Sequence, residues 1–186
     1  MTHERFTTDV MSDTESSSEP MIFPSQDWFS EYGDRVDADE EYAEVSEGWG
    51  VDFNGDFIFE MTEMPVDELD HDAMPEFLVD DLDTYVTEES GKGYTGQAYM
   101  ALENGGCPEC HLIDPDEEPD VGFYLRADYD TWKELMRAEL GVIDGLMGGK
   151  FDLDGDMQKV LQYSDAAVQL TDLASSIDAG FADEEY

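Results

Sequence analysis

Residues 107–111 hold both cysteines of the chain, in the order Cys107-Pro108-Glu109-Cys110-His111. Two thiolates and an imidazole could hold zinc or iron, although structural zinc usually takes four ligands and no second cysteine pair exists. The same order matches the C-x-x-C-H pattern of covalent haem attachment, but no export signal is expected here. A redox disulfide is a third use, although redox pairs usually begin a helix and this pair sits in a loop containing Gly and Pro. A metal or redox site at Cys107, Cys110 and His111 therefore stays open, beside the simpler interpretation of reduced cysteines in a loop.

No other group of residues has the spacing of a catalytic centre. Asp152, Asp154 and Gly155 resemble part of a calcium loop, but that alignment puts Lys150 at the first ligand position and Leu161 at the last. Paired carboxylates arise by chance among 49 acidic residues, and the three histidines show no arrangement with a nucleophile. We therefore predict that the protein is not an enzyme.

The composition is strongly acidic, with 49 Asp and Glu against eight Lys and Arg, and a formal net charge of -41. Such a charge is typical of a disordered chain, or of a folded protein from a salt-rich cytoplasm in which ions screen the surface. Hydrophobic residues make up 40% and aromatic residues 12% of the chain, which favours the folded protein. The sequence therefore predicts a halophilic protein that folds in molar salt.

The same charge excludes several classes of partner. Nucleic-acid backbones and anionic membrane surfaces repel a protein whose few basic residues are scattered along the chain. No run of about 18 apolar residues could span a membrane, and the N-terminus lacks the layout of a secretory signal. We expect a cytoplasmic protein with no nucleic-acid partner and no stable membrane insertion. Its oligomeric state is not predicted.

The first half of the chain predicts two helices and a hairpin. Ser25 can cap a helix whose apolar residues recur at spacings of three and four over residues 28–36. A short helix is expected at residues 42–45. Glycines and aromatic residues over 49–61 indicate a hairpin.

The middle of the chain predicts a further helix, a second hairpin, a strand and an amphipathic helix. Pro75 suits the first position of a helix that continues to residue 82. Residues 84–102 read as two strands joined by a glycine turn, and residues 121–125 read as another strand. Apolar residues occupy one face of a helix over 130–140, with charged residues opposite.

Residues 142–162 predict a short helix, a glycine turn, a strand over 151–154 and a long final helix over 156–175. This order of elements and the residues that form them resemble the C-terminal part of the sterol-carrier-protein domain family, in a halophilic archaeal form. The family carries a Met-x-Gly-Lys-x-x-x-x-Gly-Asp pattern before its last helix. The matching residues here are Met147, Gly149, Lys150, Gly155 and Asp156. The resemblance extends more loosely over residues 28–177.

The elements predict an α/β fold of the α+β type: a mostly antiparallel sheet of about five strands, covered by helices on one side. The resemblance implies the same design, with an apolar tunnel between sheet and helices that binds sterols, fatty acids or other lipids. Each implied tunnel residue could equally be ordinary core. By position, the resemblance assigns to the tunnel Trp132, Met136, Leu146, Met147, Phe151, Leu153, Met157, Val160, Leu161 and Leu170.

Three segments are expected: a disordered acidic leader over 1–22, a single domain over 23–178 and an acidic tail over 179–186. The predicted function is non-catalytic binding or carriage of a sterol-like, isoprenoid, quinone or acyl lipid, which needs no cofactor. The alternative is a metal-binding or redox accessory protein that holds zinc or iron at the cysteine pair. A third hypothesis is an interaction domain whose tunnel is filled by side chains.

Overall fold

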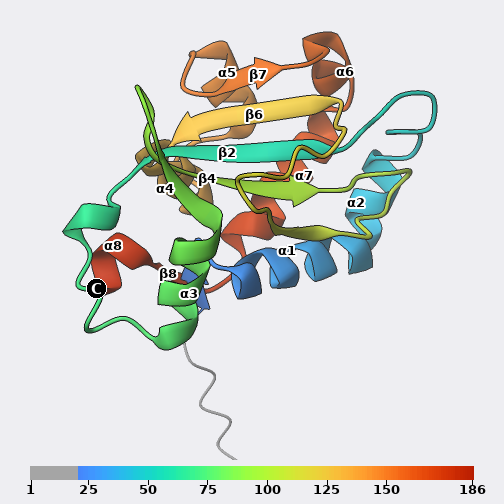
Figure 1. The fold of residues 1–186 in the computed structure, drawn as a ribbon. Coiled ribbons are helices and arrows are strands. Elements are labelled where there is room, and N and C mark those ends of the chain that lie inside the picture. The colour runs from blue at the N-terminus through green and yellow to red at the C-terminus, as the bar shows by residue number, and fades with distance from the viewer. Residues whose placement is uncertain (1–20) are drawn as a thin grey trace, which may run out of the picture.

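A six-stranded mixed sheet forms the centre of the structure, a computed structural model that describes residues 21–186 (Figure 1). The strand order is β3-β4-β2-β6-β7, and β5 pairs with β4 beyond the end of β3. All pairs are antiparallel except β2 with β6, which confirms the expected mostly antiparallel sheet. The strands are β2 (Phe57–Met64), β3 (Val86–Glu89), β4 (Gly93–Met100), β5 (Cys110–Leu112), β6 (Phe123–Asp128) and β7 (Asp152–Asp154).

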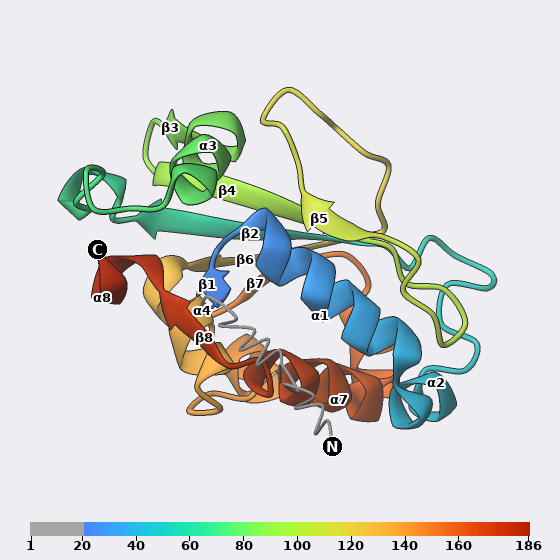
Figure 2. The ribbon, with the colours of Figure 1, turned by 90° about the horizontal axis from the view of Figure 1, so that it is seen from below.

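Helices α1, α4 and α7 cover one face of this sheet, as Figure 2 shows. Helix α3 and a 3-10 turn at Val66–Glu68 lie toward the β3 edge instead. The helices are α1 (Gln26–Ala38), α2 (Glu40–Val45), α3 (Glu76–Tyr85), α4 (Tyr129–Met136), α5 (Val142–Met147), α6 (Met157–Gln162), α7 (Ser164–Ser175) and α8 (Ala182–Glu185).

Helix α1 forms as its local sequence predicts. The Ser25 side chain accepts a hydrogen bond from the backbone N–H of Trp28 at 3.2 Å, which satisfies one free donor of the first turn. Trp28, Tyr32 and Val36 are buried on one face because they recur at spacings of four residues. This aromatic face packs toward the sheet.

Strand β2 separates two chemical environments. Phe57, Phe59 and Met61 face the helices, because successive side chains of a strand alternate between its faces. Glu60 lies between them on the opposite face and pairs with Gln97 of β4 and with a residue of β6. One side of the sheet is therefore apolar beneath the helices, and the other carries charge.

The prediction of a hairpin over 49–61 is wrong for its first strand. Residues 46–53 form turns and bends, and only Phe57–Met64 is a strand. Gly48 and Gly50 have positive φ angles of 88° and 73°, which curl the chain before a strand can begin. Trp49 packs instead on the Phe57 and Phe123 rings, and its indole N–H donates to the carbonyl of Gly55 at 2.9 Å.

The long helix expected over 156–175 is two helices. Tyr163 leaves helical geometry, with φ −105° and ψ 35°, and separates α6 from α7. Its ring packs edge-on against Trp49 at 5.3 Å. The helix expected over 130–140 also ends early, at Met136, and Ala138 beyond it has a positive φ of 56°.

Strands β1 (Met21–Phe23) and β8 (Ala179–Phe181) form a separate parallel pair. Residues 179–186, expected as an acidic tail, form β8 and α8, and we call this segment the strap. Phe181 and Ala182 of the strap are buried, and the Phe23 and Phe181 rings lie 6.2 Å apart. Of the expected leader, residues 1–20 lie outside the described residues, and Met21 and Ile22 belong to β1.

Candidate functional site

An apolar cavity of about 80 Å³ lies between the sheet and the helices. The sheet contributes residues of β2, β6 and β7, and the helices close the opposite side. Apart from Thr171 and the Tyr32 hydroxyl, the lining side chains are hydrocarbon, thioether or aromatic. The lining residues are Phe23, Trp28, Phe29, Tyr32, Phe57, Phe59, Met61, Leu125, Trp132, Leu135, Met136, Val142, Leu146, Leu153, Val160, Ala167, Leu170, Thr171 and Ala174.

The polar atoms of this lining are bonded to the protein itself. The Tyr32 hydroxyl donates to the carbonyl of Leu170 at 3.0 Å, and the Thr171 hydroxyl donates to the carbonyl of Ala167 at 3.0 Å. The Trp132 indole N–H donates to the carbonyl of Glu60 at 3.0 Å. Burial raises the pKa of Tyr32, so its hydroxyl stays neutral. The cavity therefore offers contact with apolar surface and no free acid, base or nucleophile among the residues that line it.

Six of the ten residues assigned to the tunnel by resemblance line this cavity. Phe151 and Met157 do not, although both pack in the core around it. Phe151 lies against Trp132, with ring centroids 5.1 Å apart at 78°, and so supports a lining residue from behind. The six lining residues are Trp132, Met136, Leu146, Leu153, Val160 and Leu170.

Met147 and Leu161 do not line the cavity, which corrects the assignment of these two residues. Their side chains are 73% and 41% exposed. Each follows a lining residue on a short helix, Leu146 on α5 and Val160 on α6. Consecutive helical residues point about 100° apart, so only one of each pair can face the cavity.

The assignment by resemblance missed the lining residues of α1 and β2, because it relied on the motif near the C-terminus. The sequences of α1 and β2 both show a periodic pattern from which these residues could have been predicted. The helical spacing of Trp28 and Tyr32 and the alternation of Phe57, Phe59 and Met61 already mark faces that must be buried.

The size of the cavity limits what fits in the described conformation. Sites for drug-sized ligands are roughly 300–1,000 Å³, so about 80 Å³ is too small for a whole lipid. A second cavity of about 90 Å³ shares Phe23, Trp28, Met136 and Ala174 with the first and reaches β8. A third space, of about 220 Å³, has three carboxylates in its wall and does not suit an apolar ligand.

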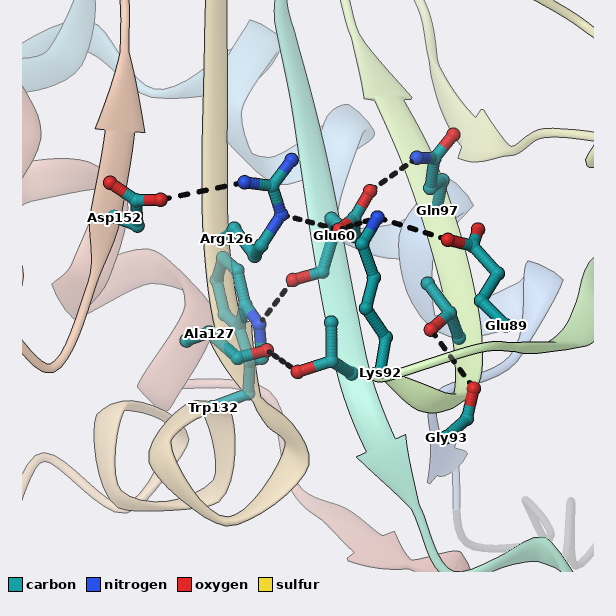
Figure 3. Close-up of polar contacts among 11 residues, drawn as sticks. Glu60, Glu89, Lys92, Gly93, Gln97, Arg126, Ala127, Trp132 and Asp152 are labelled. Carbon is teal, nitrogen blue, oxygen red and sulfur yellow. Dashed lines mark hydrogen bonds and ion pairs between the residues drawn. The ribbon is translucent and has the colours of Figure 1, made fainter.

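Behind the cavity, a row of alternating charges crosses the other face of the sheet (Figure 3). Glu60 is 2% exposed and accepts hydrogen bonds from Arg126 Nε at 2.5 Å, Gln97 Nε2 at 2.6 Å and Lys92 Nζ at 3.1 Å. Arg126 and Lys92 also pair with Asp152 and Glu89 at the two ends of the row, at 3.4 and 3.0 Å.

This charge row fixes the protonation state of Glu60. Burial alone would raise the pKa of its carboxyl, but the hydrogen bonds from Arg126, Gln97 and Lys92 outweigh burial and lower it. Because the Glu60 carbonyl also holds the Trp132 indole, the row anchors β2 behind the cavity wall.

The cysteine pair lies apart from the cavity, where β5 packs on α1. Cys110 points toward Gly33 of α1, whereas His111 points to the other face of β5, with its ring 5.6 Å from that of Tyr99. The three side chains therefore do not converge, and within residues 21–186 no cluster of three His, Cys, Asp or Glu residues has metal-binding geometry. Burial, with a contribution from Asp37, raises the pKa of Cys107 to about 12, and burial also raises the pKa of Cys110.

These raised pKa values predict unreactive thiols in the folded protein. At pH 8 a thiol with a pKa of about 12 is ionised in roughly one molecule in 10⁴, against about a quarter for a free cysteine. We expect Cys107 and Cys110 to react with Ellman's reagent only when the chain unfolds. Labelling should be timed in molar salt, with the urea-unfolded protein as the control. Rapid labelling of the folded protein would contradict the burial and support the redox hypothesis.

The chain is similar in sequence to one protein family and in fold to solved structures. Residues 84–168 match the model of the SCP-2 sterol transfer family, which confirms the predicted resemblance. The fold is similar to a crystal structure of sterol carrier protein 2, with 19% identity and TM-score 0.60 over 82% of this chain and 97% of that one. It is also similar to the solution structure of a conserved hypothetical protein from Thermus thermophilus, with 20% identity and TM-score 0.61 over 88% and 94%. No curated protein sequence matches the chain.

Proposed function

We propose that this chain, which carries an SCP-2 sterol transfer family match over residues 84–168, binds and carries a hydrophobic lipid without changing it chemically. The apolar cavity is the observation on which the proposal rests. Removing apolar surface from water contributes about 25 cal/mol per Å², so binding there needs no charged or nucleophilic group. The bonded polar atoms of Tyr32 and Thr171 leave the lining free to contact hydrocarbon.

The ligand classes that suit such a lining are sterol-like, isoprenoid, quinone and acyl lipids. We infer that carriage takes place in a salt-rich cytoplasm, where the acidic surface is screened. No helix of the described residues combines the length and apolar character needed to cross a membrane. The proposed role is carriage of one of these lipids.

A whole lipid requires the cavity to widen. The wall formed by α5, β7 and α6 is connected by glycines, with positive φ at Gly149 and Gly155. Met136, an unbranched side chain, lines both the apolar cavity and the second cavity and can change rotamer readily. We infer that movement of this wall and of Met136 joins the two cavities when a lipid enters.

Filling the cavity should remove binding. Replacing Ala167, which lines the cavity, by leucine is expected to weaken lipid binding by about fivefold or more, since overpacking by a few methyl groups costs about 1–3 kcal/mol. The matched control is Val168→Leu on the same helix, because Val168 is 49% exposed. Binding is measured by the fluorescence of Trp28 and Trp132 during lipid titration in molar salt, and by native mass spectrometry of the purified protein.

Two results would contradict the proposal. The first is the absence of any co-purified lipid together with no uptake of a fatty acid or sterol, which would favour an interaction domain with a filled tunnel. The second is equal binding by the Ala167→Leu and Val168→Leu proteins, which would place the lipid elsewhere.

A further inference from the structure

Two basic residues at the end of α4 contact the strap, and one of them lines the second cavity. Arg137, the residue that caps the C-terminus of α4, lines this cavity together with Ala179 and Phe181 of β8. Lys133 lies one helical turn earlier, on the same side of the helix. In a chain with eight basic residues and a net charge of -41, such a pair beside a cavity is a distinct electrostatic feature.

Carboxylates of the strap form ion pairs with both cations. Lys133 Nζ lies 2.7 Å from Asp183 Oδ2 and 2.9 Å from Glu184 Oε1, and Arg137 also pairs with Glu184. The Lys133 side chain is only 9% exposed, so its charge needs a partner. The geometry shows that a carboxylate fits between these two cations.

The strap is held by its strand pair with β1, by its ion pairs and by the buried Phe181. Its strand β8 pairs with β1 through three residues, and Phe181 lies beneath both cations, 5.3 Å from Lys133 Nζ and 4.8 Å from the Arg137 guanidinium. Asp183 Oδ1 is buried and has no hydrogen-bond partner within residues 21–186. A bound carboxylate that replaced the strap would free this oxygen to reach water.

The two cavities are neighbours, and Arg137 lines the second of them. They share Phe23, Trp28, Met136 and Ala174, so movement of Met136 would join them. An unbranched chain that fills both cavities would place its polar end beside Arg137 and Lys133. The guanidinium of Arg137 presents paired donors that match a carboxylate.

We propose that Lys133 and Arg137 form the head-group site for a long-chain carboxylate, and that Asp183 and Glu184 of the strap occupy this site while the cavity is empty. This inference rests on the proposed function and specifies its ligand class. On entry, one ligand carboxylate replaces the two strap carboxylates between the cations, in the bridging place that Glu184 holds, so neither cation is left unpaired. It also removes β8 from the end of the second cavity.

The test compares laurate with dodecanol, which have equal chains and different heads, by titration of tryptophan fluorescence in molar salt. The full-length protein is expected to bind laurate about tenfold more tightly than dodecanol, because a hydrogen bond to a charged group is worth about one factor of ten. Arg137→Gln should make the affinities for laurate and dodecanol about equal, and Arg137→Lys should restore part of the preference for laurate. Glu184→Gln removes the competing carboxylate and should strengthen laurate binding by about threefold or more.

The matched control is Glu185→Gln, which changes the net charge equally and touches neither cation. It should leave both affinities within about twofold. Equal binding of laurate and dodecanol, or weaker laurate binding by Glu184→Gln, would overturn the head-group site while leaving lipid binding intact. Failure of both ligands to bind would overturn the proposed function as well. Circular dichroism of each variant in the same salt shows whether it has folded.

Discussion

Replacement of Glu60 by alanine is expected to lower the free energy of unfolding by about 2–4 kcal/mol. The change leaves Arg126 and Lys92 without their shared buried carboxylate and Gln97 without its acceptor. The expected loss is smaller than for a fully buried ion pair, because both cations keep 36% of their side-chain surface in solvent. Urea unfolding in molar salt, followed by tryptophan fluorescence, measures the difference.

Glu88→Ala is the matched control, because Glu88 is exposed on β3 and its loss changes the net charge equally. Its effect should stay within about 0.5 kcal/mol. The Glu60 effect should also depend on pH in one direction. Its pKa is lowered in the folded protein, so its contribution is present above the ordinary carboxyl pKa of about 4 and disappears as the pH falls below it. A Glu60 variant as stable as Glu88→Ala at neutral pH would show that the charge row does not anchor β2.

Removal of salt is expected to unfold the protein. At a net charge of -41 the folded surface repels itself, and the Debye length grows from about 3 Å at 1 M to about 10 Å at 0.1 M. We expect cooperative unfolding by urea in 3 M potassium chloride and loss of tertiary structure near 0.1 M. The near-ultraviolet circular dichroism of the buried Trp28, Tyr42 and Tyr129 reports this transition.

Sucrose provides the control for this salt dependence. Sucrose strengthens burial by exclusion from the protein surface but does not shorten the Debye length. It should therefore replace salt only in part. Unfolding that is independent of salt between 0.1 and 3 M would contradict the proposed adaptation to a salt-rich cytoplasm.

Elements fixed by nearby residues were predictable from the sequence. Helix α1 follows from the Ser25 cap and its apolar spacing, and the β3-β4 hairpin follows from the glycine turn between its strands. The strand over 49–53 was predicted wrongly because aromatic residues also suit a packed turn, and the positive φ values of Gly48 and Gly50 decide between the two.

Features that depend on distant residues were not predictable. The β1-β8 pair joins Met21 to Ala179, and each strand has only three residues, too few for a periodic signal. The volume of the cavity depends on how α1, α7 and the sheet meet, which no local pattern specifies. Within the site, helix geometry rather than the family motif separates the lining residues Leu146 and Val160 from the exposed Met147 and Leu161.

The pairing of β1 with β8 has a consequence for the order of folding. The pair joins Met21 to Ala179, which lie at opposite ends of the described sequence. Contacts between residues so far apart cost loop-closure entropy before they contribute any stability, so they form slowly. We expect the sheet and the helices to form first and to bring these two short strands together. The wall of the second cavity at β8 is then the last to form during refolding.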